Sequence, residues 1–178
     1  MQWYNEPKKW SRHDDSVVLQ ANPKTDFWRL THDGMVRDSG HFYYQRQSGN
    51  FLAQVKISGN YATLYDQAGL MLRSDEAHWT KCGIEYVDGL QQASAVVTRE
   101  YSDWSVVPLV DNPAALWLRL QRRDVTIEVH YALDGTHYNL LRQAYFPPVE
   151  TVDVGLMCAA PIGEGFSVTF EGFTLQSL

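Results

Sequence analysis

Apolar and polar residues alternate with a period of two along most of the chain, which is the pattern of half-buried β-strands. In the segment 115–121, three leucines fall on one side of the predicted strand, and Trp117, Arg119 and Gln121 fall on the other. No window shows the 3.6-residue period of an amphipathic helix, and a single helical turn is expected at 112–115. The pattern therefore predicts an all-β protein whose strands turn an apolar side to the core and a polar side to solvent.

Asp-Gly pairs interrupt the alternation where hairpins are expected, because both residues tolerate positive φ. Asp88-Gly89 should join strands over 80–86 and 93–99, and Asp134-Gly135 should join strands over 125–131 and 138–142. Further strands are expected at 16–20, 27–30, 41–47, 50–57, 67–73, 115–121, 152–158 and 166–175. Many short strands separated by turns predict a two-sheet antiparallel β-sandwich, a jelly roll, in a single domain over residues 1–178.

The length, net charge and cysteine content of the chain indicate its size class and exclude some classes of partner. A chain of 178 residues suits one domain with a real core. The net charge is -6 and no basic run occurs, so a nucleic-acid partner is not expected. No apolar run approaches the ~20 residues of a membrane helix, and no secretory signal follows the first lysines, so no membrane contact is expected. Cys82 and Cys158 are interpreted as buried free thiols, which favours a reducing, cytoplasmic location.

Motifs for catalysis are scarce. There is no Gly-x-Ser-x-Gly elbow, no metal-binding histidine spacing, no phosphate loop and no dinucleotide fingerprint, so neither a metal nor a cofactor is expected. Glycoside hydrolysis needs a pair of carboxyl groups. Glu85 and Asp88 lie three positions apart and so face opposite ways, but a cross-strand partner for Glu85 stays open.

One set of polar residues follows the predicted solvent side of the central strands and forms the candidate ligand-binding site. Planar polar groups and aromatic faces are typical of sugar sites, and Gly69 and Gly83 would leave room beside them. The alternative is a solvated sheet face with ion pairs among Lys81, Glu85 and Arg119. The other tryptophans, Trp104 among them, are predicted to be core or loop anchors. The candidate residues are Asp66, Gln67, Arg73, Lys81, Glu85, Trp117 and Arg119.

The segments that carry most of these residues also carry a family resemblance. Residues 66–73 (DQAGLMLR), 79–86 (WTKCGIEY), 97–98 (VT) and 102–105 (SDWS) resemble the regulation-of-enolase protein family. That family is a domain of unknown function in the concanavalin A-like lectin/glucanase superfamily. The resemblance implies a concanavalin A-like jelly roll with one concave sheet face, where superfamily members bind or cleave carbohydrate. It supplies no catalytic residues.

Three functions follow as hypotheses. The first is a non-catalytic module that binds a carbohydrate or another small molecule on the concave face, with Lys81, Glu85, Trp117 and Arg119 lining it. The second is a glycoside-active enzyme with Glu85 as one carboxyl group. The third, implied by the family name, is a regulatory protein–protein interaction with a metabolic enzyme.

Overall fold

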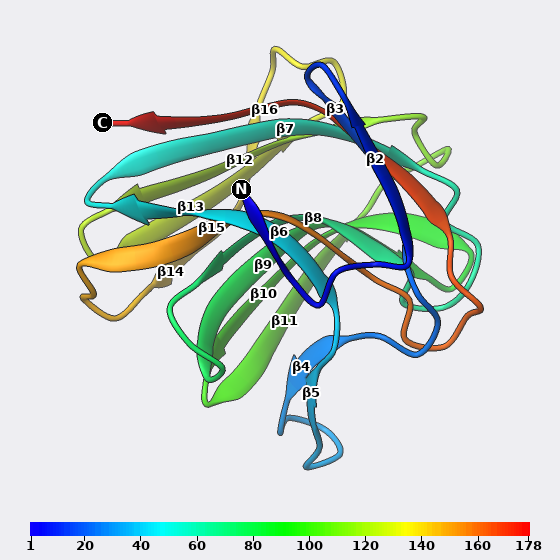
Figure 1. Cartoon of the computed structure of the whole chain (residues 1–178), viewed down its shortest axis with the longest axis horizontal. Helices are drawn as coiled ribbons and strands as arrows, with labels where there is room; N and C mark the ends of the chain where they lie inside the picture. Colours follow the sequence, from blue (N-terminus) through cyan, green and yellow to red (C-terminus); the bar gives the residue numbers. More distant parts are fainter.

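The computed structural model describes residues 1–178 and consists of two seven-stranded antiparallel sheets packed face to face (Figure 1). Sheet A has the order β1 (Gln2–Tyr4), β6 (His41–Ser48), β15 (Thr151–Ala159), β8 (Gln67–Arg73), β9 (His78–Val87), β10 (Leu90–Arg99) and β11 (Tyr101–Pro108). Sheet B has the order β14 (Asn139–Tyr145), β13 (Thr126–Ala132), β12 (Leu116–Arg123), β7 (Phe51–Gly59), β16 (Ser167–Ser177), β3 (Ser16–Gln20) and β2 (Lys9–His13). The predicted two-sheet sandwich is confirmed. A small separate ribbon pairs β4 (Phe27–Arg29) with β5 (Val36–Asp38).

Both predicted hairpins are present. In the first, Val87 pairs with Leu90 across Asp88 and Gly89, whose φ angles of 53° and 81° fit a tight hairpin turn. In the second, β13 pairs with β14.

Four strands, β1, β2, β5 and β11, were not predicted, and the helical turn expected at 112–115 is absent. No helix long and apolar enough to cross a bilayer occurs.

The space between the sheets holds the apolar side chains that the alternation assigned to the core. A cluster of 31 buried residues includes Leu70 and Ile84 from sheet A and Leu118 and Val129 from sheet B. The two cysteines, both core-facing, are buried and unbridged, and burial raises the pKa of both thiols. The division of each strand into a core side and an outer side is therefore confirmed.

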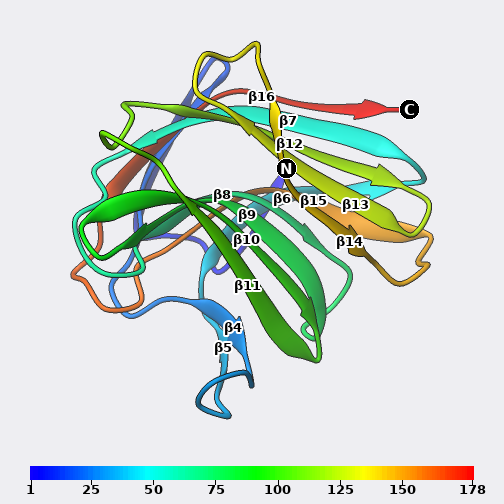
Figure 2. The ribbon, with the colours of Figure 1, turned by 180° about the vertical axis from the view of Figure 1, so that it is seen from behind.

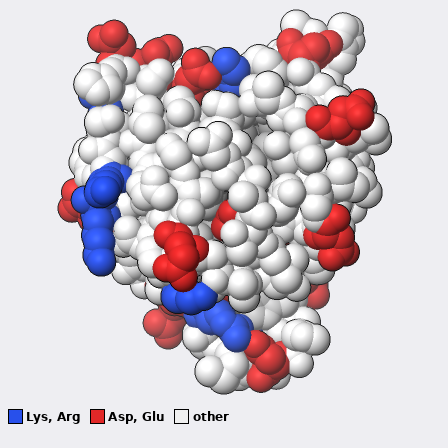
Figure 3. Space-filling view, turned by 90° about the vertical axis from the view of Figure 1, so that its right-hand side faces the viewer, with Lys and Arg blue, Asp and Glu red and all other residues white.

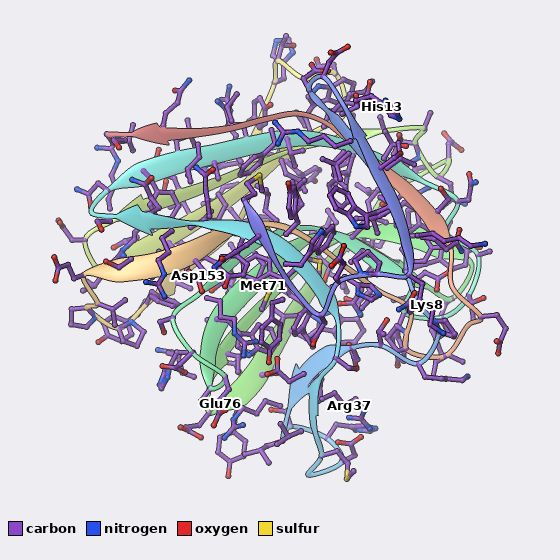
Figure 4. The ribbon with its side chains drawn as sticks, in the orientation of Figure 1. Lys8, His13, Arg37, Met71, Glu76 and Asp153 are labelled. Atoms are coloured by element: carbon purple, nitrogen blue, oxygen red, sulfur yellow. The ribbon has the colours of Figure 1, made fainter.

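The outer face of sheet A is not solvated, however, because residues 22–40 cover much of it. Figures 1 and 2 show the β4–β5 ribbon on the side of sheet A that faces away from sheet B. Phe27 is fully buried there, with its ring centroid 6.2 Å from that of Trp79. Met71 lies on this same face (Figure 4). The cover creates a second apolar cluster, made of Phe27, Phe42, Met71, Trp79, Val96 and Met157.

An ion pair fastens the cover to the sheet. The Arg73 guanidinium donates two hydrogen bonds to the Asp38 carboxylate, at 2.6 and 2.8 Å. The Tyr4 hydroxyl donates to the same carboxylate, and the guanidinium lies 4.5 Å from the Tyr4 ring centroid. Because both partners are largely removed from water, the pair is a fixed point between β8 and β5 rather than a surface contact.

A buried histidine should make stability depend on pH. The backbone amide of Asn22, the residue that begins the cover, donates a hydrogen bond to Nε2 of His41. Nδ1 of His41 is hydrogen-bonded to the Asn5 carbonyl. Burial lowers the pKa of His41 below its usual 6.5. The unfolded chain then binds more protons than the folded one just below pH 6.5, so the contribution of His41 to the free energy of unfolding should fall as pH drops from 7 to 5.

Urea unfolding of the protein and of a His41→Gln variant at several pH values measures this contribution. The variant should lose less stability than the parent on acidification. His137 is exposed and Asp134 raises its pKa, so its contribution has the opposite sign. His137→Gln should therefore not lessen the loss, and equal pH slopes in the parent and His41→Gln would contradict the assignment.

Candidate ligand-binding site

The strand register brings polar residues of β8, β9 and β10 together on the outer face of sheet A. Gln67 of β8 lies beside Glu85 of β9, which lies beside Gln92 of β10. In the next row, two glycines face each other across β8 and β9, and Ser94 of β10 continues that row. The outer face therefore presents a bare stretch of backbone bordered by polar side chains.

That bare stretch forms a small hollow. It has a volume of about 10 Å³ and is lined by Gln67, Lys81, Gly83, Glu85, Ser94 and Met157, together with backbone neighbours. A space of this size accommodates about one water molecule, or a polar group of similar size. Gly83 lies at the hollow, and the facing Gly69 and Gly83 let the backbones of β8 and β9 approach closely there.

Glu85 is a buried carboxylate with no cationic partner within ion-pair distance. One of its oxygens, Oε2, accepts hydrogen bonds from the Ser94 hydroxyl and the Trp104 indole N–H, both at 2.8 Å. The other oxygen, Oε1, accepts no hydrogen bond from the protein. Only 7% of the residue is exposed, and the unpartnered Oε1 oxygen keeps access to solvent. It is therefore a strong acceptor for a donor that enters the hollow.

Lys81 stands on the other side of the hollow, and its ammonium group is already engaged. Nζ donates to the Phe27 carbonyl at 2.6 Å and to Oε1 of Gln67 at 2.5 Å. Asp26, from the start of the cover, lies 3.7 Å from Nζ. Lys81 thus joins the cover to the hollow and places a positive charge near it. The ion pairs that the alternative interpretation placed among Lys81, Glu85 and Arg119 are not formed, because Lys81 pairs with Asp26 and Arg119 belongs to sheet B.

Two other predicted site residues hold structure near this face. Asp66 accepts hydrogen bonds from the Ala62 and Thr63 amides through Oδ2, which closes the loop before β8. Arg73 is occupied by Asp38. Of the seven predicted residues, Gln67, Lys81 and Glu85 line the hollow itself.

Trp117 and Arg119 lie elsewhere, and the prediction that they share a surface with Lys81 and Glu85 is wrong. Both belong to β12, in sheet B, where they point away from the core. Arg119 donates to Gln54 at 2.7 Å and lies 3.6 Å from the Tyr138 ring centroid. Alternation along β12 identified their side of the strand correctly, but it carries no information about which sheet the strand joins. A role for this separate surface in binding stays a prediction.

The sequence interpretation also missed residues of the site. Ser94 and Trp104 hold the Glu85 carboxylate, and Asp26 faces Lys81. Gln92 adds a buried side-chain oxygen, Oε1, without a hydrogen-bond partner. The register of the hairpin at Asp88-Gly89 was a sufficient signal for Ser94 and Gln92, since it places them opposite Gly83 and Glu85.

The side of the molecule that lies at the right of Figure 1 carries scattered acidic and basic groups separated by uncharged surface (Figure 3). No continuous basic patch covers this face, so it offers nothing that attracts a phosphate backbone. The structure also brings together no three side chains of the metal-ligating types. At the hollow, the structure places hydrogen-bonding groups and, beside Glu85, the ring of Trp104.

Comparisons with known proteins agree with this fold. The family model described as "Protein of unknown function (DUF1349)" matches residues 3–178. The chain belongs to the DUF1349 family. A relative in Saccharomyces cerevisiae, "Regulation of enolase protein 1", is 40% identical over 175 residues, which are 98% of this chain and 88% of the relative. The family resemblance noted in the sequence is thereby confirmed.

Solved structures extend the comparison beyond DUF1349. A crystal structure of a functionally unknown protein from Saccharomyces cerevisiae matches with a TM-score of 0.96 and 39% identity, covering 99% of this chain and 96% of that one. The GH43 protein BlXynB from Bacillus licheniformis matches with a TM-score of 0.72 and 16% identity, covering 97% of this chain and 36% of that one. The carbohydrate-binding module CBM66 from Bacillus subtilis matches with a TM-score of 0.61 and 14% identity, covering 98% and 95%. The last two show a shared jelly-roll fold.

Proposed function

We propose that this DUF1349 protein is a non-catalytic module that binds a carbohydrate or another small hydroxylated ligand at the hollow on the outer face of sheet A. The observation that carries the proposal is the free Oε1 oxygen of Glu85, which opens onto a hollow with room for one polar group. A ligand hydroxyl that enters there donates to this oxygen and replaces a water molecule. The exposed part of Trp104 then offers a ring face to the rest of the ligand.

The jelly-roll neighbours support a carbohydrate as the ligand class. One of them is itself a carbohydrate-binding module, and another belongs to a glycoside hydrolase of which this fold occupies about a third. Since those likenesses show only the fold, the ligand class rests on the hydrogen-bonding groups of the hollow.

The number of acidic residues at the hollow favours binding over catalysis. Hydrolysis of a glycosidic bond uses two carboxyl groups placed on either side of it. Of the nine residues that line the hollow, Glu85 is the single acid. Asp26, the acid beside Lys81, is engaged by Lys81 and by Gln67. A glycoside-active enzyme with Glu85 as one carboxyl group is therefore the weaker alternative.

Isothermal titration with pentoses, hexoses and their oligosaccharides tests the proposal. The protein should bind at least one of these sugars, and Glu85→Gln should weaken that binding about tenfold or more, because a charge-assisted hydrogen bond is lost. Glu128→Gln, on the outer side of β13 in sheet B, is the matched control and should leave the affinity unchanged. No heat with any sugar, or equal losses in the two variants, would end the proposal.

A regulatory contact with a metabolic enzyme is the second candidate, and it draws on the printed name of the yeast relative. Exposed apolar residues along β11, the edge strand of sheet A, give it a surface, since Tyr101, Trp104 and Val106 are 62%, 41% and 39% exposed. Titration with purified enolase separates the two candidates. A cytoplasmic location, which the cysteines favour, fits either of them and stays a prediction.

A further inference from the structure

The direction from which a ligand reaches the hollow follows from what surrounds it. On the β8 side, the loop before β8 and the start of the cover close the hollow, with Gln67 bonded to both Asp26 and the Tyr65 carbonyl. Toward the start of β9, the apolar cluster under the cover occupies the outer face of the sheet from Lys81 back to Trp79. Two of the sides on which a long ligand would lie are therefore filled by the protein's own chain.

On the hairpin side, Gln92 is buried beside Glu85, and the Tyr65 ring centroid lies 6.3 Å from that of Trp104. The fourth side is the edge of the sheet. β11 is the last strand of sheet A, and its outer residues continue the rows of the hollow. Val106 lies beside Ser94, and Trp104 lies one row away and donates to Glu85. These two side chains are 39% and 41% exposed, whereas Ser94 and Glu85 are buried. Solvent thus meets the hollow over β11.

The part of the outer face that the cover leaves open along β9 is short as well. Along β9, the distance from Glu85 to Gly83 spans two residues, or about 7 Å. The hollow itself holds one group the size of a water molecule. One projecting hydroxyl matches this space, and the ring that carries it stays outside the hollow, over Val106 and Trp104. An internal stretch of polysaccharide laid along β9 would need the covered half of the face.

We propose that the site binds the terminal unit of its ligand end-on, and that the ligand enters over the β11 edge past Val106 and Trp104. This inference rests on the proposed function and adds the ligand form and the route of entry. A chain attached to the bound unit leaves over the edge into solvent and makes no further contact with the protein. Affinity then depends on the terminal unit and not on the number of units behind it.

Two adjacent valines give a matched pair of variants. Val106 and Val107 are both 39% exposed, but they point to opposite sides of β11, and only Val106 lies in the row of the hollow. Val106→Trp should obstruct entry and weaken binding of the best sugar at least about tenfold, whereas Val107→Trp should change the affinity less than about threefold. Thermal unfolding of both variants establishes that each is folded.

The length series completes the test. The dissociation constants of the mono-, di- and hexasaccharide of the same sugar should agree within about threefold. Affinity that rises with each added unit, or equal effects of Val106→Trp and Val107→Trp, would overturn end-on binding while Glu85→Gln still reports on the site. Absence of binding to every sugar would instead overturn the proposed function, and this inference with it.

Discussion

Replacing Asp38 by alanine should destabilise the protein by about 3 kcal/mol, because it leaves the buried Arg73 guanidinium without its counter-charge. The side chain of Arg73 is 9% exposed, and Asp38 supplies both of its short hydrogen bonds. Loss of Asp38 also releases β5 from β8, so the cover over sheet A should loosen. Chemical denaturation measures the change in the free energy of unfolding.

The same ribbon contains an exposed ion pair as a control. Arg37 donates one hydrogen bond to Asp33 at 2.6 Å, whereas Arg73 donates two to Asp38, and both Arg37 and Asp33 are more than a third exposed. Asp33→Ala should therefore cost less than about 1 kcal/mol. A double variant, Asp38→Leu with Arg73→Met, should be more stable than Asp38→Ala alone, since it leaves no unpaired charge. Equal costs for Asp33→Ala and Asp38→Ala would show that burial does not set the strength of the clamp.

Gly69→Ala should cost about 3 kcal/mol or more, for a steric reason. A Cβ atom at this position would lie 1.8 Å from the Cys82 carbonyl oxygen, which belongs to the backbone of the neighbouring strand and cannot rotate away. The two central strands of sheet A would have to separate beside the hollow. The melting temperature should fall, and sugar binding should weaken with it.

A second glycine isolates the clash from the general cost of replacing glycine. Gly34 has a φ of 70° and open space around the position of a Cβ atom. Gly34→Ala should cost about 1 kcal/mol from backbone strain alone. If Gly69→Ala proved no more damaging than Gly34→Ala, the close approach of β8 and β9 would not be the constraint that we infer.

Local pattern was sufficient for the strands and for part of the site. Turn residues and alternation defined the hairpin at Asp88-Gly89, and with it the row that contains Glu85. Leu118, predicted to face the core, is fully buried, and its neighbours Trp117 and Arg119 face outward as predicted. These results follow from the period of two, which is a property of a few consecutive residues.

Sheet membership was not available from the same pattern. β12 pairs with β7, whose residues lie about sixty positions earlier, and such a long-range choice depends on the packing of the whole chain. Trp117 and Arg119 were for this reason assigned to the wrong surface. Trp104 was not predicted as a site residue for a related reason. The polar residues around it do not alternate with apolar ones as in a typical strand, so β11 is recognised only from its pairing with β10.

The cover was equally hidden. The strand expected at 27–30 is present as β4, but nothing in the alternation of residues 22–40 indicated that this segment folds over a sheet. That Phe27 packs into the outer face of sheet A depends on Gly40, where a Cβ atom would lie 2.3 Å from the Phe27 ring. The face predicted to be solvated is instead a second core, and the site is what remains open beside it.

The most direct test of the account uses the six tryptophans as reporters. Each indole N–H gives its own signal in a nitrogen–proton correlation spectrum, and Trp104→Ala and Trp117→Ala identify the two that matter. Saturation with the sugar selected by calorimetry should shift the Trp104 signal, because its N–H is bonded to Glu85, and should leave the Trp117 signal in place. A shift confined to Trp117 would place the ligand on sheet B and contradict the account.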